Sequence, residues 1–150
     1  MRKIRVFLAG IIQGSKKGKG IHSQNYRTRL KSLIRKHLPA ALIYDPVANY
    51  PGSVNYDDRR ARRIFFSLMK KAAQTDVLVA FLPEASLGTA IEIWEAHKAG
   101  VFTVVITPMK HNWAVKFLPD VVLEDVNEFE KFLAEGGLLK APGKRRAGRK

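Results

Sequence analysis

One acidic residue near the middle of the chain, Glu92, stands in surroundings that suit a catalytic carboxylate. It lies in the segment LPEASLGTAIEIWEA, where a helix is expected to begin near Leu87. On such a helix the residues next to Glu92 are Gly88, Thr89 and Ala96, which are small and leave room for a ligand. A carboxylate in this position can attack the anomeric carbon of a bound sugar, where the transition state resembles an oxocarbenium ion. From spacing alone, a surface glutamate is the alternative.

The start of the same helix is a candidate anion site. Ser86 stands immediately before the first helical residue, which is the usual place of an N-cap serine. The free N–H groups and the positive end of the helix dipole at this point favour a phosphate or a carboxylate. A serine that only caps the helix is the alternative.

A second candidate anion site is the segment GIIQGSKKGKG, residues 10–20. Its glycines give a flexible backbone whose N–H groups can surround a phosphate, and its lysines supply positive charge. The glycine spacing fits neither the P-loop pattern nor the G-x-G-x-x-G fingerprint, so the indication comes from composition. A mobile, solvated loop is the alternative.

The elements that must position these segments follow an alternating pattern. Apolar runs rich in β-branched residues alternate with longer segments of helical period, which predicts β-α-β units and a parallel sheet. The expected strands are 4–9, 41–47, 76–82, 101–107 and 120–123. The expected helices run from a cap at Ser23 or Asn25 to about His37, over 59–74, over 87–99 with Gly100 at C′, and over 126–134 behind a cap at Asp125. Ligands bind beyond the carboxyl ends of parallel strands, so the loops after the first, third and fourth strands should form the site.

The charge of the chain is unevenly distributed. The net charge is +14, and residues 1–71 carry +14, residues 72–137 carry −6, and residues 138–150 add six basic residues and no acid. We expect one domain over 1–137, in which the segment 48–58 forms a functional loop, and a basic, disordered tail over 138–150. The asymmetry predicts an anionic partner, either a phosphorylated small molecule or nucleic acid. A well-charged, soluble surface is the alternative.

The composition also excludes several kinds of site. The chain has no cysteine, so a disulfide framework, a thiolate nucleophile and the usual structural zinc sites are excluded. Its histidines, His22, His37, His97 and His111, show no metal-ligand spacing. Its apolar runs are far shorter than a membrane span, and we interpret the basic, then apolar, amino terminus as the first strand of a cytoplasmic protein. We expect no metal, no cofactor and no membrane contact.

Three segments, FLAGIIQG, TDVLVAFLPEASLGTAIEIWEAHKAG and VFTVVI, resemble the nucleoside 2-deoxyribosyltransferase family, nearest to its branch of 2′-deoxynucleoside 5′-monophosphate N-glycosidases. The resemblance extends over about residues 1–135 and is most specific over 76–100. It implies an α/β, flavodoxin-like three-layer sandwich with a five-stranded parallel sheet. It also implies that Glu92 is the nucleophile, that a glycosyl-enzyme intermediate is resolved by water or by a second base, and that the chain forms a homodimer or a larger homo-oligomer.

The same resemblance implies a set of substrate contacts. The monophosphate hydrolases bind the 5′-phosphate with a serine six residues before the nucleophile, where the transferases have Asp, so Ser86 favours a phosphorylated substrate. The first loop would contact sugar and phosphate, and Lys110 or Asn112, in a region that can reach a neighbouring subunit, would contact phosphate. The expected substrate-binding residues are therefore Gly10, Ile12, Gln13, Gly14, Ser86, Gly88 and Asn112, and the expected partner is a nucleoside monophosphate or a related N-glycoside.

Two residues depart from the family pattern. Leu68 stands about where the family has an Asp that contacts the base or the transferred proton, and leucine cannot do acid-base chemistry. Asp57 or Asp58 is the candidate substitute. Trp94 replaces a usual glycine, where it would narrow the site, offer a face for base stacking, or serve as a core or interface aromatic.

Two other functions stay open at this point. The chain could be a catalytically impaired module that binds nucleotides or nucleic acid through the tail and a cluster of arginines, namely Arg59, Arg60, Arg62 and Arg63. Alternatively, the same carboxylate could hydrolyse another N-glycoside, such as a dinucleotide.

Overall fold

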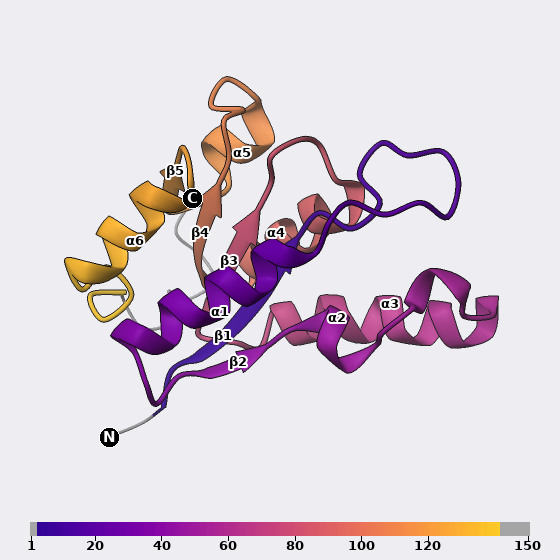
Figure 1. Ribbon diagram of the computed structural model, residues 1–150, viewed down its shortest axis with the longest axis horizontal. Helices are drawn as coiled ribbons and strands as arrows, with labels where there is room; N and C mark the ends of the chain where they lie inside the picture. Colours follow the sequence, from indigo (N-terminus) through magenta and orange to yellow (C-terminus); the bar gives the residue numbers. More distant parts are fainter. Residues whose placement is uncertain (1–2, 142–150) are drawn as a thin grey trace.

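The centre of the molecule is a five-stranded parallel sheet with the strand order β2-β1-β3-β4-β5 (Figure 1). The computed structural model describes residues 3–141. The strands are β1 (Arg5–Gly10), β2 (Leu42–Tyr44), β3 (Val77–Phe81), β4 (Phe102–Ile106) and β5 (Val121–Leu123). All four strand pairs are parallel, as predicted. The strand order and the helices on both faces make this the predicted flavodoxin-like α/β fold.

Four longer helices connect and cover the strands. They are α1 (Asn25–His37), α3 (Asp58–Ala72), α4 (Leu87–Lys98) and α6 (Val126–Ala134). Asp125 caps α6 through the Glu128 N–H, and Gly100 takes the predicted left-handed position after α4. Within residues 3–141, no helix is both long and apolar enough to cross a membrane.

The predicted cap of α1 is wrong. The N-cap residue is Gln24, and its side chain makes no capping hydrogen bond. The Ser23 hydroxyl accepts only from the N–H of Asn25, the first helical residue, at 3.4 Å. Tertiary contacts of Gln24 with the preceding loop, rather than a local cap, therefore fix the start of this helix.

Three short helical segments lie in regions where the sequence pattern predicted only loop or strand. They are α2 (Pro46–Asn49), the 3-10 helix η1 (Ser53–Asn55) and α5 (Trp113–Phe117). The second strand ends at Tyr44 because Asp45 caps α2 by accepting from the Val47 N–H, and Pro46 occupies the first helical position. Each of these segments is too short to show a hydrophobic period.

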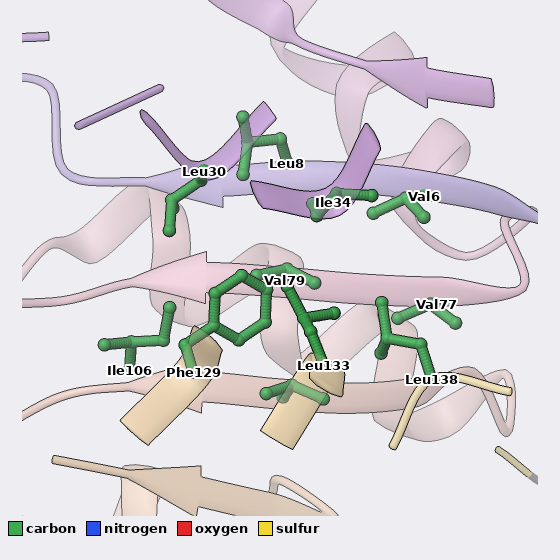
Figure 2. Packing of buried hydrophobic residues seen from close by; sticks show 11 residues of the cluster. Val6, Leu8, Leu30, Ile34, Val77, Val79, Ile106, Phe129, Leu133 and Leu138 are labelled. Carbon is green, nitrogen blue, oxygen red and sulfur yellow. The ribbon is translucent and has the colours of Figure 1, made fainter. Parts of the chain in front are cut away.

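The two faces of the sheet are covered by different helices (Figure 1). On one face, side chains of β1, β3 and β4 pack against α1 and α6, and Figure 2 shows this cluster around Phe129. On the other face, alternate residues of the same strands pack against α3, α4 and α5. Leu138, the first residue of the expected tail, is buried in the cluster of Figure 2, whereas residues 142–150 lie outside the described residues.

Candidate active site

The candidate site lies where β1 and β3 end side by side. Gly10 is in register with Phe81, and the Ile11 N–H donates to the Phe81 carbonyl at 3.1 Å just beyond the strands. The chain then leaves β1 toward α1 on one face and leaves β3 toward α4 on the other. In parallel sheets, ligands bind at such a point, where the connections of two adjacent strands leave toward opposite faces. The structure thus brings together the loops that were predicted after the first and third strands.

Glu92 is half-buried on the helix that follows β3, and one of its carboxyl oxygens is enclosed. Among residues 3–141, Oε2 of Glu92 has no hydrogen-bond partner. Burial raises the pKa of Glu92 from 4.5 to about 8, and the positive charge of Arg27 opposes the shift only partly. A surface glutamate has neither property, because water would both solvate the oxygens and keep the pKa low. At neutral pH this carboxyl group is mostly protonated, and it releases its proton near pH 8.

The position of Glu92 on α4 is set by which side of that helix is buried. Thr89, Ile93 and Ala96 are buried toward the sheet. Glu92 lies on the flank between this buried face and the solvent, one turn beyond Gly88. A Cβ atom added to Gly88 would meet no other atom within 4 Å, so the space at Gly88 is open.

Trp94 does not cover Glu92. Its side chain is 46% exposed on the outer face of α4, and its ring stacks on His97 with centroids 5.9 Å apart. Two residues on a helix differ by about 200° in direction, so the indole and the carboxyl group point to different sides. The indole therefore neither covers Glu92 nor belongs to the core.

Tyr26, from the first turn of α1, lies against the end of β1 and within electrostatic reach of Glu92. Its hydroxyl donates to the Ile11 carbonyl at 2.8 Å, and its ring packs on Phe81 at 4.4 Å. The ring lies so close to Gly10 that any Cβ at that position would collide with it, which explains the glycine. Burial raises the pKa of Tyr26, and the nearby charge of Glu92 contributes to the increase. The sequence pattern placed Tyr26 only on the apolar side of a helix.

Beneath Tyr26, a buried guanidinium joins α1 to the ends of β1 and β2. Arg27 is 3% exposed and donates to the carbonyls of Leu8 and Gly10 and to Oδ1 of Asp45, at 3.1 to 3.2 Å. Asp45 also accepts from Lys31 Nζ at 2.8 Å. Sequence reasoning missed both Arg27 and Asp45. The spacing of Arg27 from Leu30, three residues, placed it on the buried face of the helix and was the available signal.

The first loop is tied to the loop after β3. His22 Nε2 lies 2.9 Å from Glu84 Oε1, although the approach is not aligned for a hydrogen bond. A Cβ at Gly14 would collide with the His22 ring, so the glycine permits this closure. The Gln24 amide holds the other end of the loop by donating to the carbonyls of Ile11 and His22.

Within this loop, the residues predicted to bind substrate have different surroundings. Ile12 is half-buried and accepts a backbone hydrogen bond from the His22 N–H at 2.7 Å. Gln13 is exposed, and its amide donates to the Gly18 carbonyl at 3.3 Å. The lysines of the loop, Lys16, Lys17 and Lys19, are exposed.

Ser86 caps α4, as predicted. Its hydroxyl accepts from the Thr89 N–H at 3.5 Å and shares a hydrogen bond with the Thr89 hydroxyl at 2.9 Å. The first turn of α4 contains no acidic residue, so no carboxylate within that turn opposes the binding of an anion at the positive dipole end.

The remaining residues singled out in the sequence are two helix caps, an exposed acid and a residue packed against the core. Asp57 caps α3 by accepting from the Arg60 N–H at 2.9 Å, and Asp58 is exposed in the next position. Asn112 caps α5 through the Ala114 N–H at 3.0 Å. Leu68 packs against the apolar cluster beneath α3 and α4.

Among residues 3–141, no three His, Asp or Glu side chains gather in a group that could hold a metal ion.

The architecture is similar to that of solved structures. A 2-deoxyribosyltransferase from the psychrotolerant bacterium Bacillus psychrosaccharolyticus superposes with a TM-score of 0.64 and 15% identity over 84% of this chain and 90% of that chain. The chain has the fold of this deoxyribosyltransferase. A conserved protein from Enterococcus faecalis V583 superposes with a TM-score of 0.63 and 17% identity, over 90% of this chain and 99% of that one. No protein-family model and no curated protein sequence matches the chain.

Proposed function

We propose that the chain cleaves the N-glycosidic bond of a nucleoside or deoxynucleoside 5′-monophosphate, with Glu92 as the nucleophile. The observation that carries the proposal is the enclosed Oε2 of Glu92, which lacks a hydrogen-bond partner within residues 3–141 and lies on the helix that follows β3. The fold shared with a 2-deoxyribosyltransferase and the resemblance of residues 76–100 to the monophosphate N-glycosidases support it.

The proposed reaction proceeds in two displacements. The Glu92 carboxylate attacks C1′, and the bond from C1′ to the base nitrogen breaks with its electron pair staying on the base, which takes up a proton. Water then attacks C1′, loses a proton and releases the carboxylate, so that the products are the free base and a sugar phosphate. Leu68 stands in place of the family Asp and packs in an apolar cluster, so it cannot donate this proton. Asp57 and Asp58, at the start of α3, are the candidate proton donors.

The 5′-phosphate is assigned to the start of α4. Ser86 and the N–H groups of the first turn form the start of the helix, and this turn carries no acidic residue. The lysines of the loop 10–20 add positive charge. Gly88 leaves open space in the same turn. A nucleotide held in this way would extend its sugar from the helix end toward Glu92, one turn further along.

The direct test is base release from a panel of ribo- and deoxyribonucleoside monophosphates and the matching nucleosides, followed by chromatography. We expect Glu92→Gln to reduce kcat/KM at least about 1,000-fold, as losses of covalent nucleophiles do. Glu95→Gln is the matched control, since Glu95 lies on the same helix and pairs with Lys98 at 2.9 Å. Base release that survives Glu92→Gln, or no release from any substrate by the wild type, would refute the proposal.

The outer face of α4 supports a further part of the proposal, that the chain forms a homo-oligomer. Leu87, Ile91 and Trp94 follow one another at helical spacing on this face, and all three are exposed. Trp113 and Phe117 of α5 are also exposed. Exposed apolar side chains that follow helical spacing on one face of a helix are typical of a protein interface. Light scattering should give a mass of at least two chains for the wild type and of one chain for Trp94→Lys; a monomeric wild type would contradict this.

A further inference from the structure

The outward face of α3 is a strip of basic side chains that surrounds an exposed aromatic ring. The buried residues of this helix, Ile64 and Ala72, lie on one side, and helical geometry places Arg59, Arg62 and Lys70 on the other. Phe66 lies among these cations and is 54% exposed. In Figure 1, α3 lies at the outside of the molecule, beyond β1 and β2.

The cations of this strip have no acidic partner within residues 3–141. Within residues 3–141, Arg59, Arg62, Arg63 and Lys70 form no salt bridge, whereas Arg5, Arg27, Lys31 and Lys36 on other elements each pair with an acid. Four unpaired cations within three turns of one helix repel one another, which costs stability. An anionic partner would remove that cost.

Aromatic rings add a second kind of contact to the strip. Arg62 lies over the Phe66 ring, 5.2 Å from its centroid, and Phe65 packs edge-on against the same ring at 5.3 Å. At the start of the helix, the Arg60 guanidinium covers the Tyr56 ring at 3.7 Å. Proteins that bind single strands combine a positive track for the backbone with aromatic faces on which bases stack. A duplex offers its phosphates to such a strip but keeps its bases stacked inside.

We propose that this face of α3, formed by Arg59, Arg62, Arg63, Phe66 and Lys70, binds single-stranded nucleic acid. From Arg59 to Lys70 the helix rises about 16 Å, which matches about five phosphates of a stacked strand at about 3.4 Å each. The cations contact phosphates, and Phe66 stacks on a base. The inference does not depend on Glu92, because the strip lies on a different helix.

The test measures the fluorescence anisotropy of labelled 12-nucleotide DNA and RNA single strands, and of the DNA duplex, with the full chain. The triple variant Arg59→Gln, Arg62→Gln, Arg63→Gln should bind both single strands at least about 30-fold more weakly at low salt. The slope of log K against log salt should fall in size by about two, since each lost phosphate contact contributes about 0.7 for a single strand. The matched control, Arg35→Gln, Lys116→Gln, Lys131→Gln, removes the same charge from exposed positions elsewhere and should bind within about twofold of the wild type.

Phe66→Ala separates single-strand binding from general attraction to polyanions. It leaves the charge unchanged and should weaken single-strand binding about 5- to 50-fold while leaving duplex binding unchanged. Circular dichroism confirms that each variant is folded. Equal binding by the triple variant and the wild type would overturn the proposal, since residues 142–150 are present in both. No binding by the wild type, or equal loss in the matched control, would overturn it as well.

Discussion

Two buried carboxyl groups near the carboxyl edge of the sheet have opposite surroundings. Asp45, which follows β2, accepts from Arg27 and Lys31 and from the Val47 N–H that it caps. Glu92, on α4, has an enclosed oxygen with no such partner within residues 3–141. A buried carboxylate with full hydrogen bonding ties elements together, whereas one without it lowers stability and stays available for chemistry. The difference supports the proposal that Asp45 serves the fold and that Glu92 serves the reaction.

The largest effect on stability is expected from breaking the paired group. Asp45→Ala leaves the Arg27 guanidinium buried without its carboxylate and should lower the free energy of unfolding by about 3–5 kcal/mol. Urea unfolding measures the change. Glu130→Ala is the control, since it breaks an exposed pair with Lys36 and should cost at most about 1 kcal/mol. Equal losses in the two variants would show that the Arg27–Asp45 cluster does not hold these elements together.

Removing the charge of Glu92 should raise the free energy of unfolding rather than lower it. Because the pKa of Glu92 in the folded chain is about 8 and its ordinary value is 4.5, the folded chain keeps a proton that the unfolded chain has lost between these pH values. The wild type therefore loses stability as the pH rises from about 4.5 to 8. Glu92→Gln does not titrate, so it should be more stable than the wild type by on the order of 2–4 kcal/mol at pH 8 and equal to it at pH 4.

Urea unfolding of both proteins at pH 4, 6 and 8 measures this effect. Glu95→Gln serves as the control, because Glu95 lies on the same helix with a more exposed side chain and should show no such dependence. A Glu92→Gln variant that is less stable than the wild type at pH 8 would mean that the carboxylate is well solvated or paired in solution.

The smallest of these effects concerns the rate. A nucleophilic Glu92 must be ionised, so kcat/KM for base release should rise about tenfold per pH unit below 8 and level off above it. The profile is measured with the best substrate of the panel from pH 5.5 to 9.5. A rate that falls as the pH rises through 8 would instead assign Glu92 the role of a proton donor.

Much of the fold could be predicted because its signals are local. The runs of apolar residues in β1 and β3 reflect burial on both faces of the sheet. The helical spacing in α4, with Ser86 before it and Gly100 after it, predicted the bounds of that helix closely. The second strand was predicted too long, since Asp45 and Pro46 start a helix of only one turn. Such short elements depend on caps and tertiary contacts rather than on period.

The site was predictable only in part. The small neighbours of Glu92 indicated an open flank on the helix, but its burial depends on loops that converge from distant parts of the chain. Arg27 could not be distinguished from the other cations of α1 by composition, because its partner Asp45 lies eighteen residues away on another element. Trp94 points outward because it lies two residues from Glu92 on the same helix, on a different side. The expectation that it would narrow the site came from the glycine at this position in the family and not from this angle.

The stereochemistry of the reaction tests the role of Glu92 most directly. Base release is carried out in buffer with methanol, and proton NMR identifies the anomer of the methyl glycoside that forms. Two displacements through a Glu92 intermediate predict retention, so a β-nucleotide should give the β-methyl glycoside. An inverted, α-configured product would show that methanol attacks C1′ directly, and Glu92 would then not be the nucleophile.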